Sequence, residues 1–138
     1  MRIFKSKHFD KFARKERISD DALRNAINDI ENGLIDADLG SGVIKQRLPK
    51  QGRGKSKGYR SIIVYKFAEF SLFVYGFDKN DRANITADEE ENFKAAAKTI
   101  LAFNPEQIQQ ALNSKAFIEV SNEPIQQPGK CSDPRIDE

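Results

Sequence analysis

Residues 39–68 read LGSGVIKQRLPKQGRGKSKGYRSIIVYKFA, and this stretch organises the chain. It contains no Asp or Glu, and it holds eight basic residues: Lys45, Arg47, Lys50, Arg53, Lys55, Lys57, Arg60 and Lys66. The rest of the chain carries 15 of the 23 Lys and Arg and all 21 Asp and Glu. The formal net charge of +2 is therefore the sum of a strongly cationic segment and a remainder that is acidic. Clustered cations repel one another unless an anion neutralises them. The segregation therefore indicates either a polyanionic partner or a solvated basic loop between strands.

Three strands are expected in and just after this stretch. Side chains alternate between apolar and polar over 43–48, and strand-forming residues continue over 59–67. The run at 70–77 is the most apolar of the three and is predicted to be central in the sheet. Residues 49–58 form a glycine-rich, cationic connection that we expect to be mobile and exposed. Consecutive strands with short links indicate an antiparallel meander.

Two helices are predicted before this sheet. A short first strand is expected at residues 2–5, and apolar residues at helical spacing follow within 7–16. Ser19 is a suitable N-cap for a second helix, and Gly33 suits the left-handed residue that ends it. We therefore expect two antiparallel helices joined by a short turn across residues 7–32.

The segment after the sheet predicts two more helices and an edge strand. Thr86 and Glu89 have the spacing of a capping box, and Asn104 followed by Pro105 is typical of a helix start. The residues at 116–120 are expected to form a last strand at the edge of the sheet. The predicted domain covers residues 1–120, and residues 121–138 are predicted to be a polar, disordered tail.

The composition excludes several classes of protein. Cys131 is the only cysteine, so neither a disulfide framework nor a cysteine-based metal site is expected. The N-terminal segment lacks the apolar core of a signal peptide, and no apolar run is long enough to span a bilayer. These features predict a cytoplasmic protein without a membrane segment. Histidine, cysteine and carboxylates are not found at metal-ligand spacing, so no metal or cofactor is expected.

The remaining candidates for chemistry are lysine, arginine and tyrosine. His8, the only histidine, lies far in sequence from the basic strands, so a surface or capping role is expected for it. Strand alternation places Lys45 and Arg47 on one face. Lysine and arginine can promote RNA cleavage by the 2′-hydroxyl, because they stabilise the charge that develops on the phosphate. In such a reaction Arg47 and Arg60 would hold the phosphate, and Lys45 or Lys79 would accept a proton. Tyrosines are candidates to stack on a base, although sheet packing also accounts for each of them.

Three ordered motifs make the chain similar to a known family over about residues 1–103. They are VIKQRL at 43–48, KGYR at 57–60 and FVYGFDKNDR at 73–82. With these motifs at these separations, the sequence resembles the RelE toxins of bacterial toxin–antitoxin pairs. The resemblance implies an α+β fold, in which an N-terminal helical hairpin packs on a curled antiparallel sheet and C-terminal helices follow.

The family implies a metal-independent, ribosome-dependent mRNA endonuclease that an antitoxin protein, which can carry a helix-turn-helix, neutralises. Carried over by position, the catalytic residues are Lys45, Arg47, Arg60 and Lys79. The expected RNA contacts are Lys50, Arg53, Lys55, Lys57, Tyr75 and Arg82.

One departure from the family pattern keeps other functions open. Members of the family often have a tyrosine near the end of the sheet that stacks on the cut base, whereas residues 80–85 read NDRANI. Tyr75 or Phe77 would have to take that role. The ParE branch has the same fold and inhibits DNA gyrase without catalysis. A nucleic-acid-binding module that is not a toxin is a further alternative on this fold. Both stay open because fold does not determine function.

Overall fold

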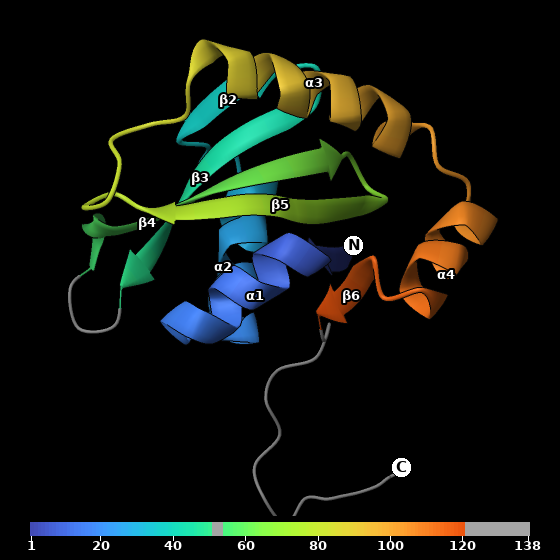
Figure 1. The fold of residues 1–138 in the computed structure, drawn as a ribbon, viewed down its shortest axis with the longest axis horizontal. Helices are drawn as coiled ribbons and strands as arrows, with labels where there is room; N and C mark the ends of the chain where they lie inside the picture. Colours follow the sequence, from blue (N-terminus) through green and yellow to red (C-terminus); the bar gives the residue numbers. More distant parts are fainter. Residues whose placement is uncertain (51–53, 121–138) are drawn as a thin grey trace, which may run out of the picture.

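The structure is a computed structural model that describes residues 1–50 and 54–120, without the side chains of residues 54–57 (Figure 1). Four helices surround one sheet of six strands. The elements in chain order are β1 (Arg2–Ser6), α1 (Lys7–Glu16), α2 (Asp20–Glu31), β2 (Ala37–Gly40), β3 (Val43–Lys50), β4 (Gly54–Lys66), β5 (Phe70–Asp78), α3 (Ala87–Leu101), α4 (Pro105–Asn113) and β6 (Phe117–Val120). The predicted α+β class and the antiparallel meander of β3, β4 and β5 are confirmed.

The sheet has the order β2-β3-β4-β5-β1-β6. The first strand β1 pairs parallel with β5, and every other neighbouring pair is antiparallel. The predicted last strand is confirmed as β6, which pairs with β1 at one edge. As predicted, β5 lies inside the sheet, between β4 and β1.

Two parts of the sheet differ from the prediction. Residues 49–58 were expected to be a connection, but β3 runs to Lys50 and β4 begins at Gly54, with these two residues paired. Pairing with a neighbouring strand overrides the weak strand propensity of glycine and lysine. Strand β2 was not predicted, because its four residues include Asp38 and Gly40 and are too short to show alternation.

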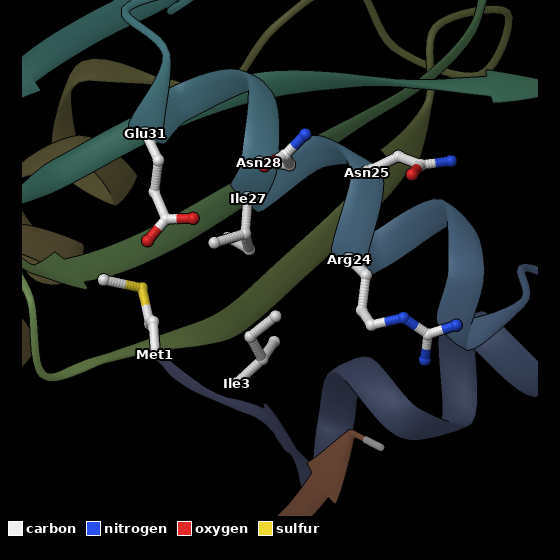
Figure 2. Close-up of a pocket in the computed structure, with 7 residues that line it drawn as sticks. All are labelled: Met1, Ile3, Arg24, Asn25, Ile27, Asn28 and Glu31. Carbon is white, nitrogen blue, oxygen red and sulfur yellow. The ribbon is translucent and has the colours of Figure 1, made fainter. Parts of the chain in front are cut away.

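Helices α1 and α2 cover one face of the sheet, and their starts are set by serine caps. Ser6 Oγ accepts from the Phe9 N–H (3.0 Å), and Ser19 Oγ accepts from the Ala22 N–H (3.2 Å), as predicted for the second helix. A hollow of about 390 Å³ lies between α2 and β1 (Figure 2). Its lining residues are Met1, Ile3, Arg24, Asn25, Ile27, Asn28 and Glu31.

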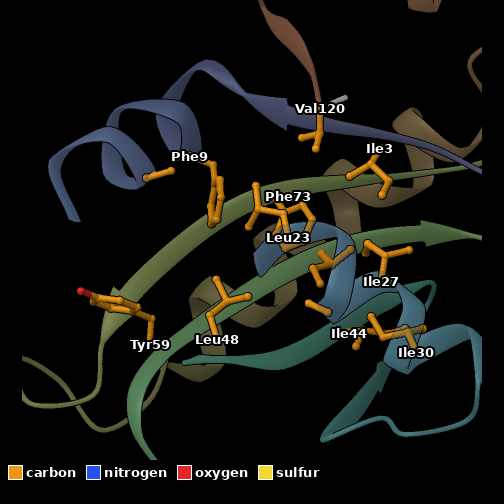
Figure 3. Packing of buried hydrophobic residues seen from close by; sticks show 13 residues of the cluster. Ile3, Phe9, Leu23, Ile27, Ile30, Ile44, Leu48, Tyr59, Phe73 and Val120 are labelled. Carbon is orange, nitrogen blue, oxygen red and sulfur yellow. The ribbon is translucent and has the colours of Figure 1, made fainter. Parts of the chain in front are cut away.

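The core beneath these two helices is made of large apolar side chains (Figure 3). Phe9 from α1 and Leu23 from α2 are fully buried against strand residues such as Leu48, Ile63 and Phe73. Burial of each such side chain contributes roughly 1.5–3 kcal/mol relative to its exposure. This core fixes which face of each strand points toward α1 and α2.

Helix α3 crosses the other face and packs on β3 and β4, and α4 packs on β6. The second core contains Val43, Ile62, Leu72 and Ala97. The predicted capping box of Thr86 with Glu89 is confirmed, as is Asn104 as the cap before Pro105, and Asn104 also forms a capping box with Gln107. Among the helices of the described residues, none is both long and apolar enough to cross a bilayer.

A register shift in β5 decides which side chains point to which core. Ile62 pairs with Tyr75 while Ile63 pairs with Phe73, so Val74 is an extra residue on β5. Beyond this bulge, Tyr75 points to the α3 side, and Gly76 points to α1. A Cβ at Gly76 would lie 2.6 Å from the ring of Phe12.

We expect Gly76→Ala to lower the free energy of unfolding by about 1–3 kcal/mol, because the added methyl group overpacks the contact with Phe12. Urea denaturation of the purified protein measures this change. The matched comparison is the same substitution in a Phe12→Ala background, where the penalty should be smaller. An equal penalty in both backgrounds would show that Phe12 does not set the limit.

Candidate functional site

Basic and aromatic side chains from three strands share one face of the sheet. Arg47 on β3 lies directly opposite Arg60 on β4, and Arg60 lies opposite Phe77 on β5. One row away, Lys45 lies opposite Ile62, which lies opposite Tyr75. Opposite residues in an antiparallel pair share a face and lie about 5 Å apart. We call Lys45, Arg47 and Arg60 the cation cluster.

The β5 bulge completes this face. Without Val74 as an extra residue, strand alternation would place Tyr75 and Phe77 on the α1 side, away from the cation cluster. With the bulge, Tyr75 and Val74 pack with the residues under α3. The site therefore depends on a local irregularity that joins aromatic residues of β5 to cations of β3 and β4.

The segment from β5 to α3 passes close to the cation cluster. The Asn84 side-chain oxygen accepts from Lys45 Nζ (3.0 Å) and from the Ile85 N–H (2.8 Å). Arg82 Nη1 donates to the Tyr75 hydroxyl (3.1 Å), and its guanidinium lies 5.6 Å from the centroid of Phe77. This segment therefore positions Lys45 and covers the two aromatic rings.

Arg60 is the unusual member of the cluster. Its side chain is buried, with 8% exposure, and Arg60 Nη1 donates to the Tyr59 carbonyl (3.4 Å). Burial lowers the pKa of the guanidinium, Arg47 lowers it further, and Asp36 raises it in opposition. An arginine stays charged in spite of such shifts, so a positive charge is held in a poorly solvated place. In the described part of the chain, Arg60 forms no ion pair with a carboxylate.

Most other cations near the site have a carboxylate partner. Arg47 Nε lies 3.7 Å from Asp36 Oδ1, and Arg82 forms a two-pronged pair with Glu89. The partner of Lys45 is instead the neutral amide of Asn84. Within the described residues, Lys45 and Arg60 are therefore the members of the cluster that form no ion pair with a carboxylate, and both lie on the same face.

Hydrogen bonds connect Arg82 and Glu89 at the start of α3. Glu89 is the third residue of the helix and also accepts from the Thr86 N–H (2.8 Å). The hydrogen bonds from Arg82 lower the pKa of Glu89 to about 2, and the same pair raises the pKa of Arg82. This arrangement fixes the guanidinium over Phe77.

The structure places Lys50, another predicted RNA contact, apart from the cluster. Lys50 Nζ pairs with Asp78 Oδ2 (2.7 Å) and lies 5.5 Å from the ring of Tyr59, which belongs to the core under α1 and α2. Burial and a hydrogen bond to Glu16 raise the pKa of Tyr59 to about 12. Lys50 therefore points to the opposite face of the sheet.

The remaining candidates are only partly described. Lys79 is exposed in the turn after β5, and its N–H donates to the Gly58 carbonyl (3.4 Å), so it lies at the Arg60 end of the sheet. Lys55 and Lys57 belong to β4, but their side chains lie outside the described part, as does the whole of Arg53.

The sequence did not indicate the position of His8. Its ring stacks on Tyr75, with centroids 5.6 Å apart and an interplanar angle of 11°. Ser6 explains the contact, because its hydroxyl caps α1 and donates to the Val74 carbonyl (3.2 Å) at the edge of β5. The helix therefore starts beside the bulge, a consequence of the parallel pairing of β1 with β5 that spacing along the chain does not reveal.

The described residues do not form a metal centre, since no group of three or more histidine, cysteine, aspartate or glutamate side chains is found among them. The hollow beside α2 in Figure 2 lies on the face opposite the cation cluster. A second hollow, of about 300 Å³, is bordered by Arg47 and Pro49 at the open edge of β3. The cation cluster is therefore the arrangement best suited to an anionic group.

Comparison with known proteins identifies one family. The model described as "RelE toxin of RelE / RelB toxin-antitoxin system" matches residues 1–120. No curated protein matches the chain.

The low pKa of Glu89 predicts a pH dependence of stability. A depressed carboxylate pKa contributes stability that is complete above about pH 5, since an unfolded Glu has a pKa of about 4.3. The contribution is lost as the pH falls toward the folded pKa of about 2. Glu89→Gln should therefore lose less stability than the wild type on acidification from pH 6 to pH 3, measured by thermal unfolding. Glu106→Gln, in the first turn of α4, is the control and should follow the wild type.

Proposed function

The chain belongs to the RelE family of toxins, and we propose that it is a metal-independent endoribonuclease that cleaves mRNA on the ribosome. The family implies a cognate antitoxin as partner. The observation that carries the nuclease proposal is the buried guanidinium of Arg60, which forms no ion pair with any carboxylate of the described residues and lies beside Arg47 and Lys45. A charge in that position gains most from an anion that arrives from outside.

The cluster suits a phosphodiester that is being cleaved by its own 2′-hydroxyl. Arg60 and Arg47 hold the non-bridging oxygens, where negative charge accumulates in the transition state. Lys45 accepts the proton of the 2′-hydroxyl, whose oxygen then attacks phosphorus. The bond to the 5′-oxygen breaks, and Lys79 donates a proton to that oxygen. The products are a 2′,3′-cyclic phosphate and a 5′-hydroxyl.

Asn84 supports the role of Lys45 as the proton acceptor. Its amide oxygen orients the amine at 3.0 Å without adding a negative charge. A carboxylate at this position would favour a protonated lysine, whereas Lys50 on the same strand pairs with the carboxylate of Asp78 at 2.7 Å. The two lysines of β3 are thus in different environments, and only Lys45 is suited to accept a proton. Our proposal assigns no RNA contact to Lys50.

Base recognition in this proposal differs from stacking on an open tyrosine. Phe77 is buried, with 4% exposure, beneath the Arg82 guanidinium, and Tyr75 is half-buried with its hydroxyl bound to Arg82. The groups that remain for a base are the planar guanidinium of Arg82 and the ring of His8. We infer that Tyr75 and Phe77 support these two groups from below.

Inducible expression of the wild type tests the proposal directly. We expect growth to stop and new mRNA 5′ ends to map within translated codons, because cleavage requires the ribosome. Growth arrest without new 5′ ends would contradict the nuclease function. If growth stops without new 5′ ends, loss of supercoiling by purified gyrase would support an inhibitor of the ParE type. If growth instead continues normally on expression, the result would support a nucleic-acid-binding module.

A substitution of Arg60 separates function from folding. Arg60→Met should lower cleavage by about 100-fold or more, since a cationic contact to the transition state is lost. It should leave the thermal unfolding temperature unchanged or raise it, because a buried charge without a carboxylate partner is replaced by an apolar chain of similar length.

The matched control is Lys66→Met at the other end of β4, where Lys66 pairs with Glu69. This variant should retain cleavage. If Arg60→Met instead unfolds at a much lower temperature, Arg60 stabilises the fold and is not held for an external phosphate.

A further inference from the structure

The exposed side of α1 carries a row of lysines next to a row of rings. Lys7, Lys11 and Lys15 are spaced by four residues, and all three are exposed. His8 and Phe12 each follow one of these lysines by one position, so the rings form a parallel row on the helix. Four residues rise about 6 Å along a helix axis. Such a spacing is comparable to one nucleotide of an extended single strand.

The carboxylates of α1 do not neutralise this lysine row. Asp10 is buried and pairs with Lys5 (3.0 Å) and Arg14 (2.9 Å), and Glu16 accepts from the Tyr59 hydroxyl (3.1 Å). As far as the structure describes the chain, no carboxylate forms an ion pair with any of the three lysines. The row therefore presents its full charge to solvent.

This charge pattern disfavours the isolated helix. Like charges four residues apart repel one another. Lys7 also lies in the first turn, where the helix dipole favours an anion instead of a cation. Neither feature supports the core, which uses the opposite side of α1 through Phe9 and Ala13. An external polyanion would compensate both unfavourable terms.

The aromatic row indicates which polyanion fits. The ring of His8 is exposed and stacks on Tyr75, and Phe12 is half-buried with its ring edge-on to Tyr59 (5.6 Å, 89°). An open hollow of about 540 Å³ along α1 is lined by His8, Lys11, Phe12, Arg14 and Lys15. Rings beside a track of lysines suit a single-stranded nucleic acid, whose bases stack while its phosphates contact cations. An acidic protein segment would use the lysines but not the rings.

We propose that this face of α1 is a second RNA-binding surface, with phosphates on Lys7, Lys11 and Lys15 and a base on His8. The proposal rests on the proposed function in one respect: the bound strand continues the one on the sheet. His8 is the connection, because it stacks on Tyr75, whose hydroxyl is bound to Arg82 beside the cation cluster.

The test measures binding without cleavage. A 12-nucleotide RNA carrying 2′-O-methyl groups has no 2′-hydroxyl to attack, so its affinity can be followed as salt is varied. Lys11→Gln/Lys15→Gln should reduce the slope of log K against log salt by about 1.4, because each phosphate contact to a single strand contributes about 0.7. The matched control is Lys94→Gln/Lys98→Gln, two lysines four residues apart on α3, and it should leave the slope unchanged.

Substitutions of His8 test the ring separately. His8→Ala should weaken binding by about 5-fold or more with the same salt slope, and His8→Phe should retain the affinity. Equal slopes for the α1 and α3 double variants would overturn the proposal. Polyglutamate serves as a polyanion without bases, and the proposal would also be overturned if Lys11→Gln/Lys15→Gln lost affinity for polyglutamate but not for RNA. Because cleavage is not measured, these outcomes test the α1 surface independently of the proposed nuclease function, even if Arg60→Met retains nuclease activity.

Discussion

The pairing of β4 with β5 is the constraint on which the rest of the structure depends. The extra residue at Val74 reverses the side to which the end of β5 points. On one side, Gly76 lets Phe12 approach the sheet and so seats α1. On the other side, Tyr75 joins the residues under α3, and Phe77 supports Arg82. A strand with regular alternation would satisfy neither core, since it would direct two large rings into α1.

The cations around the site fall into two groups, those paired with carboxylates and those without an ion-pair partner. Carboxylates compensate the cations that hold elements together, as with Lys50 and Asp78, or Arg82 and Glu89. Arg60 lacks such a partner in the described part of the chain, although it is the most buried cation of the cluster. A buried charge without an ion-pair partner lowers stability. Such an arrangement is typical of a binding site, where the ligand supplies the missing charge.

Much of the fold could be predicted because the signals are local. Alternation over 43–48 predicted a strand with Lys45 and Arg47 on one face, and Ser19 and Thr86 with Glu89 predicted the helix starts that the structure confirms. Strand β2 could not be predicted, since pairing with β3 holds its four residues. Lys50 lies on the same face as Leu48, as alternation along β3 requires, so its assignment as an RNA contact beside Lys45 and Arg47 does not agree with the structure. The roles of the site residues remain predictions.

The position of His8 follows from the length of β1 and not from any motif. Strand β1 pairs with β5 only as far as Phe73, and Ser6 then ends the strand and caps α1. The helix must therefore begin where β5 bulges, and its first turn brings His8 onto Tyr75. Were β1 two residues longer, the lysine row of α1 would start farther along β5 and lose its contact with the sheet site. The two basic surfaces are thus connected by one strand end, and we expect them to act on the same strand of RNA.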